Sequence, residues 1–357
     1  MSGVYNMTGG LKLLARQQAK RLGIAGGLEA SAILNRLGMG KTLSGRGVIF
    51  TLHHVRPRNT RFVEPNRHLE ISPEFLDRAI TTVLESGYKP IALSQLPDWL
   101  RLGNPEQPVA IFTLDDGYRD NAAHAAPVFT RHRVPFTIFV SRGLTERTHT
   151  LWWETLERLV NATDELVYDF GKGLELVEAR TQAEKAMAYE RIGSMIIGPR
   201  EDEAIAQLNE VARIYGVDAF SIVSDLVMSH DDLKALTANP LAQLGAHTIS
   251  HRALSFLSRN AVIDEMTASA IYATGITGRG TRTFSYPYGF AAAVSERDKM
   301  LAIECGFDLA VTTMPGTLDG RALANMGALP RVSLNGLYQK SRYVRALASG
   351  IPFRIMQ

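Results

Sequence analysis

Cysteine is almost absent from this sequence, and long apolar runs are absent altogether. Cys305 is the single cysteine among 357 residues, which excludes an intrachain disulfide and any zinc or iron–sulfur site built from several cysteines. No stretch has the roughly 18 uncharged apolar residues of a membrane-spanning helix. The first residues also lack the charged start, apolar core and cleavage site of a secretory leader. We therefore expect a cytoplasmic chain that neither spans a membrane nor is secreted.

Positive charge is concentrated at one end of the chain. With 45% hydrophobic and 21% charged residues, the composition is that of a globular protein with a sizeable core. Residues 1–69 contain eleven Lys or Arg but only two acidic residues, Glu29 and Glu64, so this segment has a net charge of about +9. Because the whole chain has a net charge of +3, the remaining residues carry about −6. This basic segment lacks interleaved aromatic residues and any base-reading motif, which argues against nucleic-acid binding.

Part of the basic segment has the pattern of an amphipathic helix. Its apolar face holds Leu11, Leu14, Ala15 and Leu22, whereas Lys12, Arg16, Lys20 and Arg21 lie mostly elsewhere. One interpretation is a helix that rests on an anionic membrane surface, which would make the protein membrane-peripheral. The alternative is a helix that packs on its own domain and exposes its charges to solvent.

From residue 47 onward, short apolar runs alternate with helical stretches, which predicts an α/β fold. Several of the runs are continuously hydrophobic and β-branched, as in parallel strands buried on both faces. The seven expected strands are Val48–His53, Val109–Asp115, Phe136–Val140, Gln243–His247, Thr283–Tyr286, Asp308–Thr312 and Arg331–Leu334. A helix is expected to start at Ser72-Pro73-Glu74 and to end near Gly87. The strand count favours an incomplete barrel, with an open sheet as the alternative.

Two regions depart from this alternation. Residues 1–45 form the basic, partly helical extension, and residues 145–235 form a charged, mostly helical insertion with helices expected at Glu184–Ile196 and Glu201–Tyr215. We expect the barrel to occupy residues 46–340, followed by a C-terminal helix or tail at 341–357. In a parallel barrel, reactive groups belong at the carboxyl ends of the strands.

Two adjacent carboxylates follow the second expected strand. In Phe112-Thr113-Leu114-Asp115-Asp116-Gly117, a glycine lets the chain turn directly after the acids. Adjacent side chains project differently, so one carboxylate can ligate a cation while the other accepts a proton from water. An ordinary Asp-Gly turn has the same sequence pattern.

His247-Thr248-Ile249-Ser250-His251 follows another strand. Two imidazoles four residues apart can bind one metal ion if the segment turns helically, and a carboxylate such as Asp116 would complete three protein ligands. The segment Tyr286-Pro287-Tyr288-Gly289 also follows a strand, and its proline and glycine favour a turn that would aim the Tyr288 amide at a developing oxyanion. Simple aromatic packing is the alternative for this third segment.

Together these segments resemble the polysaccharide deacetylase family, also called carbohydrate esterase family 4, which includes the chitooligosaccharide deacetylases. The resemblance covers roughly residues 47–335 and implies a distorted seven-stranded (β/α) barrel. It implies that Asp115 is the catalytic base, and that Asp116, His247 and His251 bind the metal. Zinc is the expected cation, although cobalt, nickel, manganese and iron accept similar ligands.

The sequence departs from the family pattern in two places. Ser285 stands where the family often has an arginine that holds the catalytic aspartate, so Arg331 or Arg282 is expected to substitute. The family's general acid usually comes from a C-terminal Leu-x-His motif, but no histidine follows His251.

The first strand offers a replacement for the missing acid. Its segment Leu52-His53-His54-Val55 resembles the start of circularly permuted deacetylases, where a histidine takes the acid role. The alignment selects His53, with His54 pointing away because side chains alternate along a strand. In the alternative, one of the two histidines is structural.

The sequence therefore predicts a metal-dependent hydrolase that removes N-acetyl groups from an amino-sugar glycan or its precursor. Asp115, His53, Tyr288 and Arg331 are the expected catalytic residues, and an acetylated carbohydrate is the expected substrate. The alternatives are a catalytically idle carbohydrate-binding barrel and a deacetylase of a lipid-linked or small-molecule amide. No protein partner is predicted. Trp152 and Trp153 are expected to include at least one core residue, and Asp308 has no assigned role.

Overall fold

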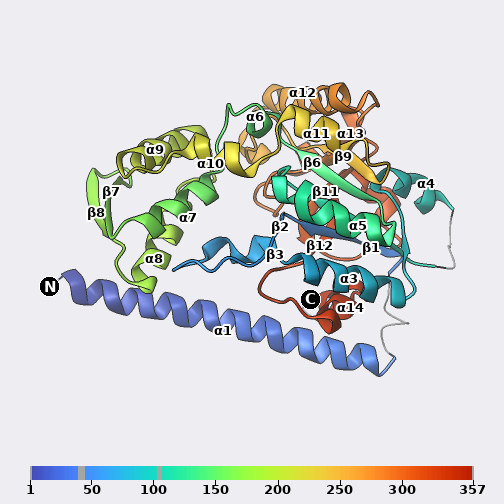
Figure 1. The fold of residues 1–357 in the computed structure, drawn as a ribbon, viewed down its shortest axis with the longest axis horizontal. Coiled ribbons are helices and arrows are strands. Elements are labelled where there is room, and N and C mark those ends of the chain that lie inside the picture. The colour runs from blue at the N-terminus through green and yellow to red at the C-terminus, as the bar shows by residue number, and fades with distance from the viewer. Residues whose placement is uncertain (1, 39–44, 103–106, 356–357) are drawn as a thin grey trace. The chain divides into compact units, whose positions relative to one another are not determined.

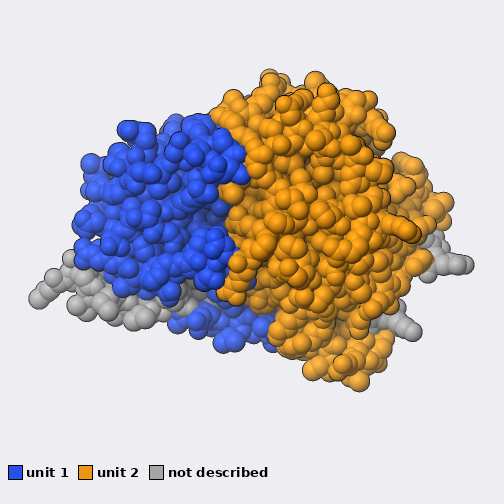
Figure 2. All heavy atoms as spheres, in the orientation of Figure 1, with its two compact units in different colours: residues 1–26, 59–68, 149–225 blue, residues 27–58, 69–148, 226–357 orange. Residues whose placement is uncertain are grey.

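The computed structural model describes residues 2–38, 45–102 and 107–355. Within these ranges, the chain divides into two compact units, which Figure 2 colours separately. We call the unit of residues 27–58, 69–148 and 226–357 the barrel unit, and that of residues 1–26, 59–68 and 149–225 the helical unit.

Seven parallel strands form a closed barrel in the barrel unit. In chain order they are β1 (Gly47–Leu52), β5 (Val109–Leu114), β6 (Phe136–Val140), β9 (Ala242–Ala246), β10 (Thr283–Ser285), β11 (Leu309–Pro315) and β12 (Leu329–Ser333). Around the barrel the order is β1-β12-β11-β10-β9-β6-β5, and β5 pairs back onto β1 with Phe50 opposite Phe112. The predicted (β/α) barrel and all seven expected strands are therefore confirmed, and the open sheet is excluded.

The strands follow directly from their composition. Every residue of β1, β5 and β6 is buried, as expected for strands covered on both faces. The minor strands of this unit are β2 (His54–Val55), β3 (Glu70–Ile71) and β4 (Lys89–Pro90). β2 pairs with β3, and β4 extends the sheet beside β5.

Helices cover the outside of the barrel (Figure 1). They are α3 (Pro73–Glu85), α4 (Leu96–Arg101), α5 (Ala126–His132), α6 (Arg142–Thr145), α11 (His230–Leu236), α12 (Arg259–Thr277), α13 (Glu296–Glu304), α14 (Ser341–Ala348) and α15 (Ile351–Ile355). Short helical turns lie at η2 (Leu93–Gln95), η3 (Asn121–Ala125), η4 (Leu254–Phe256) and η5 (Ala322–Ala328). The predicted start of α3 is confirmed, because the Ser72 side chain accepts a hydrogen bond from the Phe75 amide at 3.1 Å.

The helical unit contains α7 (Trp152–Ala162), α8 (Gln182–Gly193), α9 (Glu201–Ile214), α10 (Ala219–Leu226) and η1 (Pro65–Leu69). α8 and α9 match the two expected helices closely. The unit also contains an antiparallel hairpin that sequence reasoning did not predict, formed by β7 (Glu165–Asp169) and β8 (Leu174–Glu178).

The basic extension is helical over α1 (Ser2–Arg36). Its last turns belong to the barrel unit, where Glu29 forms an ion pair with Arg342 of α14 at 2.5 Å and accepts a hydrogen bond from the Tyr343 hydroxyl at 2.6 Å. The side chains of Leu11, Lys12 and Leu14 lie outside the described residues. Within the described part of the chain, no helix combines the length and apolar character needed to cross a membrane.

Candidate active site

Asp115 and Asp116 lie at the carboxyl end of β5, where the strand leaves the barrel. The Asp115 amide continues the ladder by donating to the Leu52 carbonyl at 3.0 Å. Asp116 then adopts φ = 72° and Gly117 φ = 69°, which turns the chain sharply. Each aspartate is only 2% exposed, so both carboxylates need partners within the protein.

Arg331 of β12 is the partner of Asp115. It donates to Asp115 Oδ1 at 2.8 Å and to Oδ2 at 2.6 Å, a two-pronged geometry that fixes the carboxylate plane. Burial alone would raise the pKa of Asp115, but the Arg331 charge and its hydrogen bonds outweigh burial and lower it. Asp115 is therefore held as a carboxylate.

Ser285 takes part in the same contact. It donates to Asp115 Oδ2 at 3.3 Å and accepts from Arg331 at 3.0 Å. Arg331 thus contacts Asp115 from β12, while Ser285 occupies the position where the family often has arginine. Arg282, the alternative candidate, instead pairs with Asp308 at the surface, with distances of 2.8 and 2.6 Å.

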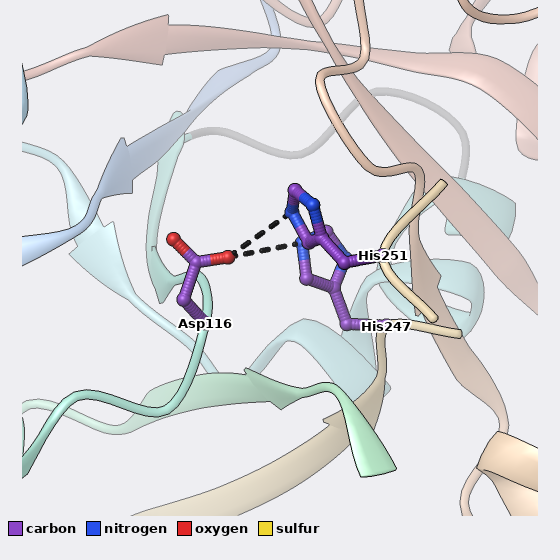
Figure 3. Close-up of side chains that lie close together, drawn as sticks. All are labelled: Asp116, His247 and His251. Carbon is purple, nitrogen blue, oxygen red and sulfur yellow. Dashed lines mark ion pairs between the residues drawn. The ribbon is translucent and has the colours of Figure 1, made fainter. Parts of the chain in front are cut away.

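The two imidazoles of the histidine segment converge on Asp116 (Figure 3). His247 Nε2 lies 3.5 Å and His251 Nε2 lies 3.2 Å from Asp116 Oδ1. One ligand atom from each of these residues lies within 4.8 Å of the others, as is required to hold a single metal ion. Burial would raise the pKa of Asp116, but the imidazoles in their protonated, metal-free form lower it well below its ordinary value.

The donor set fits a divalent cation. His247 Nδ1 lies 2.7 Å from the Ser285 carbonyl, and donation to this oxygen leaves Nε2 unprotonated toward Asp116. Asp116 Oδ1 is buried and accepts no hydrogen bond from the residues that the structure describes. An open carboxylate oxygen beside two imidazole nitrogens is the ligand chemistry that zinc and similar metals prefer.

The main chain between the two histidines is held by residues that sequence reasoning missed. Glu265 of α12 accepts hydrogen bonds from the Ile249 amide at 2.6 Å and from the Ser250 amide at 3.0 Å. On the opposite side, Ser141 donates to the Ile249 carbonyl at 2.8 Å. The available signal was a Glu on a helix 14 residues after His251, and no local pattern marked it as a loop anchor.

The third segment forms the unusual turn that its sequence predicts. Tyr288 has φ = 61° and Gly289 has φ = 65°. A Cβ atom at Gly289 would come within 2.5 Å of the Thr313 amide, so only glycine fits there. The Tyr288 ring packs edge-on against His251, with ring centroids 5.0 Å apart, which brings this turn beside the histidine segment.

The two histidines after β1 have different surroundings. His54 is fully buried, pairs with Asp120 at 2.5 Å and stacks on Tyr118 with centroids 3.5 Å apart. His53 is half-buried, and its charge contributes to lowering the pKa of both Asp115 and Asp116. The charge of His53 thus acts on both aspartates, whereas the His54 ring contacts Asp120 and Tyr118 in the turn after Asp116.

Of the remaining candidates, Trp152 and Trp153 are both buried in α7 of the helical unit, with 9% and 7% exposure. Asp308 forms an ion pair with Arg282 at the surface. Among the described residues, neither Asp308 nor Arg282 forms a hydrogen bond or ion pair with Asp115 or Asp116.

Comparison with known proteins agrees with this geometry. A family model described as polysaccharide deacetylase matches residues 102–166 and 202–308. The match includes Asp115, Asp116, His247 and His251, but His53 and Arg331 lie outside it. No curated protein matches the sequence.

Several solved structures share the fold. The Streptococcus pyogenes deacetylase PplD, in complex with acetate, is 16% identical with a TM-score of 0.52, over 81% of this chain and 92% of that chain. IcaB from Ammonifex degensii is 18% identical with a TM-score of 0.51, over 85% and 98%. BC0361, a polysaccharide deacetylase from Bacillus cereus, is 12% identical with a TM-score of 0.51, over 84% and 68%.

The matched segments carry the paired aspartates and both histidines, and the barrel brings these residues together at the carboxyl ends of its strands. On these grounds the chain belongs to the polysaccharide deacetylase family.

Proposed function

We propose that this protein is a metal-dependent hydrolase that removes an N-acetyl group from an amino sugar of a glycan or a glycan precursor. The observation that carries the proposal is the convergence of Asp116, His247 and His251 within 4.8 Å, beside a second buried carboxylate that is held ionised by arginine. This arrangement combines a cation site with a base, which is the equipment needed to hydrolyse an amide with water.

Asp116, His247 and His251 are the proposed ligands, and zinc is the proposed metal. A divalent cation at this position would acidify a water molecule and polarise the acetyl carbonyl. Asp115 accepts the proton that the attacking water loses, and Arg331 keeps its carboxylate charged and oriented. The Tyr288 amide donates to the acetyl oxygen as negative charge develops there.

The leaving amine needs a proton when the C–N bond breaks. We assign its donation to His53, because it is the histidine at the β1 rim whose charge acts on both aspartates. His54 is buried in its pair with Asp120 and is unsuited to meet a substrate.

Acetate release from acetylated chitooligosaccharides tests the activity. Asp115→Asn should lower the rate by about 10²- to 10⁴-fold, the usual contribution of a general base. Asp308→Asn, which alters an exposed carboxylate paired with Arg282, is the matched control and should leave the rate unchanged. If the wild-type chain releases no acetate from any acetylated glycan while still binding sugars, the idle carbohydrate-binding barrel is correct instead.

Metal content tests the ligand assignment separately. His251→Ala should reduce the bound zinc after gentle purification, because one of three ligands is lost. His132→Ala is the control, since His132 contacts Asp77 on the barrel's outer helices. Unchanged metal stoichiometry in His251→Ala would contradict the assignment.

We also propose that residues 1–45 contact an anionic membrane surface, which would give a cytoplasmic, membrane-peripheral enzyme access to a lipid-linked precursor. Leu22 and Ile33 of α1 and Leu37 just after it are 72%, 60% and 73% exposed. Their spacing of 11 and 4 residues places them on one side of the helix. The exposed cations Arg16, Lys20, Arg21 and Arg36 favour anionic lipids over a second copy of the same basic helix.

Flotation with liposomes tests this contact. The wild-type chain should float with vesicles containing phosphatidylserine, and a Leu22→Ser, Ile33→Ser double variant should float less. Equal recovery with neutral and anionic vesicles would contradict the proposal, as would a dimer in solution that the double variant dissociates.

A further inference from the structure

The segment around His53 is fastened by the turn that follows the paired aspartates. Asn121, which is fully buried, donates from Nδ2 to the His53 carbonyl at 2.7 Å. Asp120 Oδ1 accepts from the Val55 amide at 3.0 Å, so the chain is held at the His53 carbonyl and again two residues later. These contacts use main-chain atoms and do not engage the His53 imidazole.

The same turn anchors the neighbouring histidine. Asp120 Oδ2 lies 2.5 Å from His54 Nδ1, and Asn121 Nδ2 lies 3.0 Å from Asp120 Oδ1. Burial would raise the pKa of Asp120, but the His54 charge and hydrogen bond outweigh it and lower the pKa. The charged carboxylate of Asp120 therefore fixes the position of the His54 ring, which also stacks on Tyr118.

One more contact completes the attachment. The Asp115 amide donates to the Leu52 carbonyl at 3.0 Å. Residues 52–55 are thus tied at four successive points to a segment that begins at Asp115 and ends at Asn121. Because the proposed base, one metal ligand and both anchoring residues belong to that one segment, a shift of the segment would carry His53 with it.

We propose that Asp120 and Asn121 are positioning residues that hold His53 at a fixed place relative to Asp115 and Asp116. This inference rests on the proposed function, in which His53 protonates the leaving amine. It also gives the two adjacent histidines separate roles. His53 protonates the leaving amine, and His54 is the side chain through which Asp120 holds residues 52–55 in place. Neither anchoring residue needs to touch substrate.

The proposal predicts a dependence on the leaving group. When an amide is hydrolysed, the C–N bond breaks and the nitrogen must receive a proton, so a displaced acid slows the reaction. When 4-nitrophenyl acetate is hydrolysed, the C–O bond breaks and 4-nitrophenolate leaves without a proton. Loss of the anchors should therefore slow the amide reaction and spare the ester reaction, whereas general damage to the site would slow both.

The experiment measures kcat and KM on both substrates with the zinc-loaded full chain, for Asn121→Ala, Asp120→Asn and His53→Ala. Asn121→Ala should lower kcat on the acetylated chitooligosaccharide by about 10- to 100-fold, the range typical for outer partners of site residues. Its KM, zinc content and ester rate should stay close to those of the wild type. Asp120→Asn, which retains size and an acceptor oxygen, should show a smaller effect of the same kind. Asn260→Ala, at an exposed position of α12, is the matched control.

The outcomes separate the inference from the function on which it rests. If His53→Ala keeps the amide activity, His53 is not the acid, and the proposed function and this inference both need a different donor. If His53→Ala loses the amide activity selectively but Asn121→Ala and Asp120→Asn do not, the positioning role is wrong and the acid assignment stands. Equal losses on both substrates in the anchor variants would show a general structural role and would also overturn the inference.

Discussion

Each unit buries a cluster of polar side chains, one around Asn66 in the helical unit and one around Asp116 in the barrel unit. In the helical unit, the Asn66 amide donates to Glu157 at 3.0 Å, its Nδ2 donates to the Trp153 carbonyl at 2.9 Å, and its Oδ1 accepts from Tyr189 at 2.6 Å. Glu157 in turn pairs with Arg61. The main-chain amide and both side-chain polar atoms of Asn66 are hydrogen-bonded, as expected where a polar group only stabilises a fold.

The barrel cluster differs at a carboxylate oxygen. Asp115 is bound at both oxygens, but the buried Asp116 Oδ1 accepts no hydrogen bond among the described residues. A buried amide such as Asn66, whose side-chain atoms are all hydrogen-bonded, indicates a structural role, whereas an open acceptor beside two imidazoles indicates a place for a ligand. Removing one charge from each cluster should therefore have different effects on stability, metal binding and activity.

The largest effect is expected for Arg331→Met. This substitution leaves Asp115 buried without its cation, which should cost about 3–5 kcal/mol of stability. Because Arg331 lowers the pKa of Asp115, its loss should raise that pKa, and the pH at which activity appears should move upward. Urea unfolding and a pH–rate profile measure the two effects. An unchanged acidic limb of the profile would show that Arg331 does not tune the base.

Glu157→Gln should destabilise the helical cluster without touching the chemistry. The Arg61 guanidinium loses its charged partner, and hydrogen bonds to charged groups contribute about 1.5–3 kcal/mol. The unfolding free energy should fall by that amount while zinc content and acetate release per folded molecule stay constant. Glu165→Gln, in an exposed pair with Arg180, is the control. A loss of metal in Glu157→Gln would show that the helical cluster also supports metal binding and is not purely structural.

Glu265→Ala should act on the barrel cluster indirectly. Without its carboxylate, the main chain between His247 and His251 loses two amide contacts, and metal affinity should fall about 10- to 100-fold. Glu265→Gln, which retains one acceptor oxygen, should restore part of it. Competition with a zinc chelator gives the affinities, and Asp264→Ala, an exposed neighbour on α12, serves as the reference. Equal affinities in all four proteins would exclude a role for Glu265 in holding the ligands.

The smallest effect is expected at Glu29, outside both clusters. Hydrogen bonds and charge from Arg342, with help from Tyr343, lower its pKa from 4.5 to about 2. A lowered pKa stabilises the fold above the unfolded value and ceases to do so as pH falls through the folded value. The difference in thermal midpoint between wild type and Glu29→Gln should be small and constant from pH 7 to about pH 5, and should shrink toward about pH 2. A difference that grows on acidification would contradict the ion pair with α14.

The barrel could be predicted from the sequence because buried parallel strands appear as short, continuous apolar runs. Runs such as Val109–Leu114 are apolar without alternation, and the motifs that follow them contain Asp, His and Gly where the strands end. The resemblance to the family left two candidates, Arg331 and Arg282, for the partner of Asp115, and the closed barrel places Arg331 there.

The β7–β8 hairpin and the residues that anchor the site segments have no comparable sequence pattern. In the β7–β8 hairpin, the buried Leu166, Tyr168 and Val177 are interleaved with the exposed apolar residues Val167, Leu174 and Leu176. The sequence therefore lacks the alternation of apolar and polar residues that predicts a half-buried strand. Glu265, Asp120 and Asn121 bind main-chain atoms of distant segments. Main-chain partners have no side-chain signature, and only three-dimensional placement identifies them.

The left-handed residues of the structure have a consequence for engineering. Of the six non-glycine residues with positive φ in the described part of the chain, Asp116, Thr248, His251 and Tyr288 belong to the three site segments. For a β-branched residue such as Thr248 this conformation is strained. Selection for heat resistance alone would thus favour glycine at these positions. The most thermostable descendants of this protein should be inactive ones, unless the screen also demands turnover.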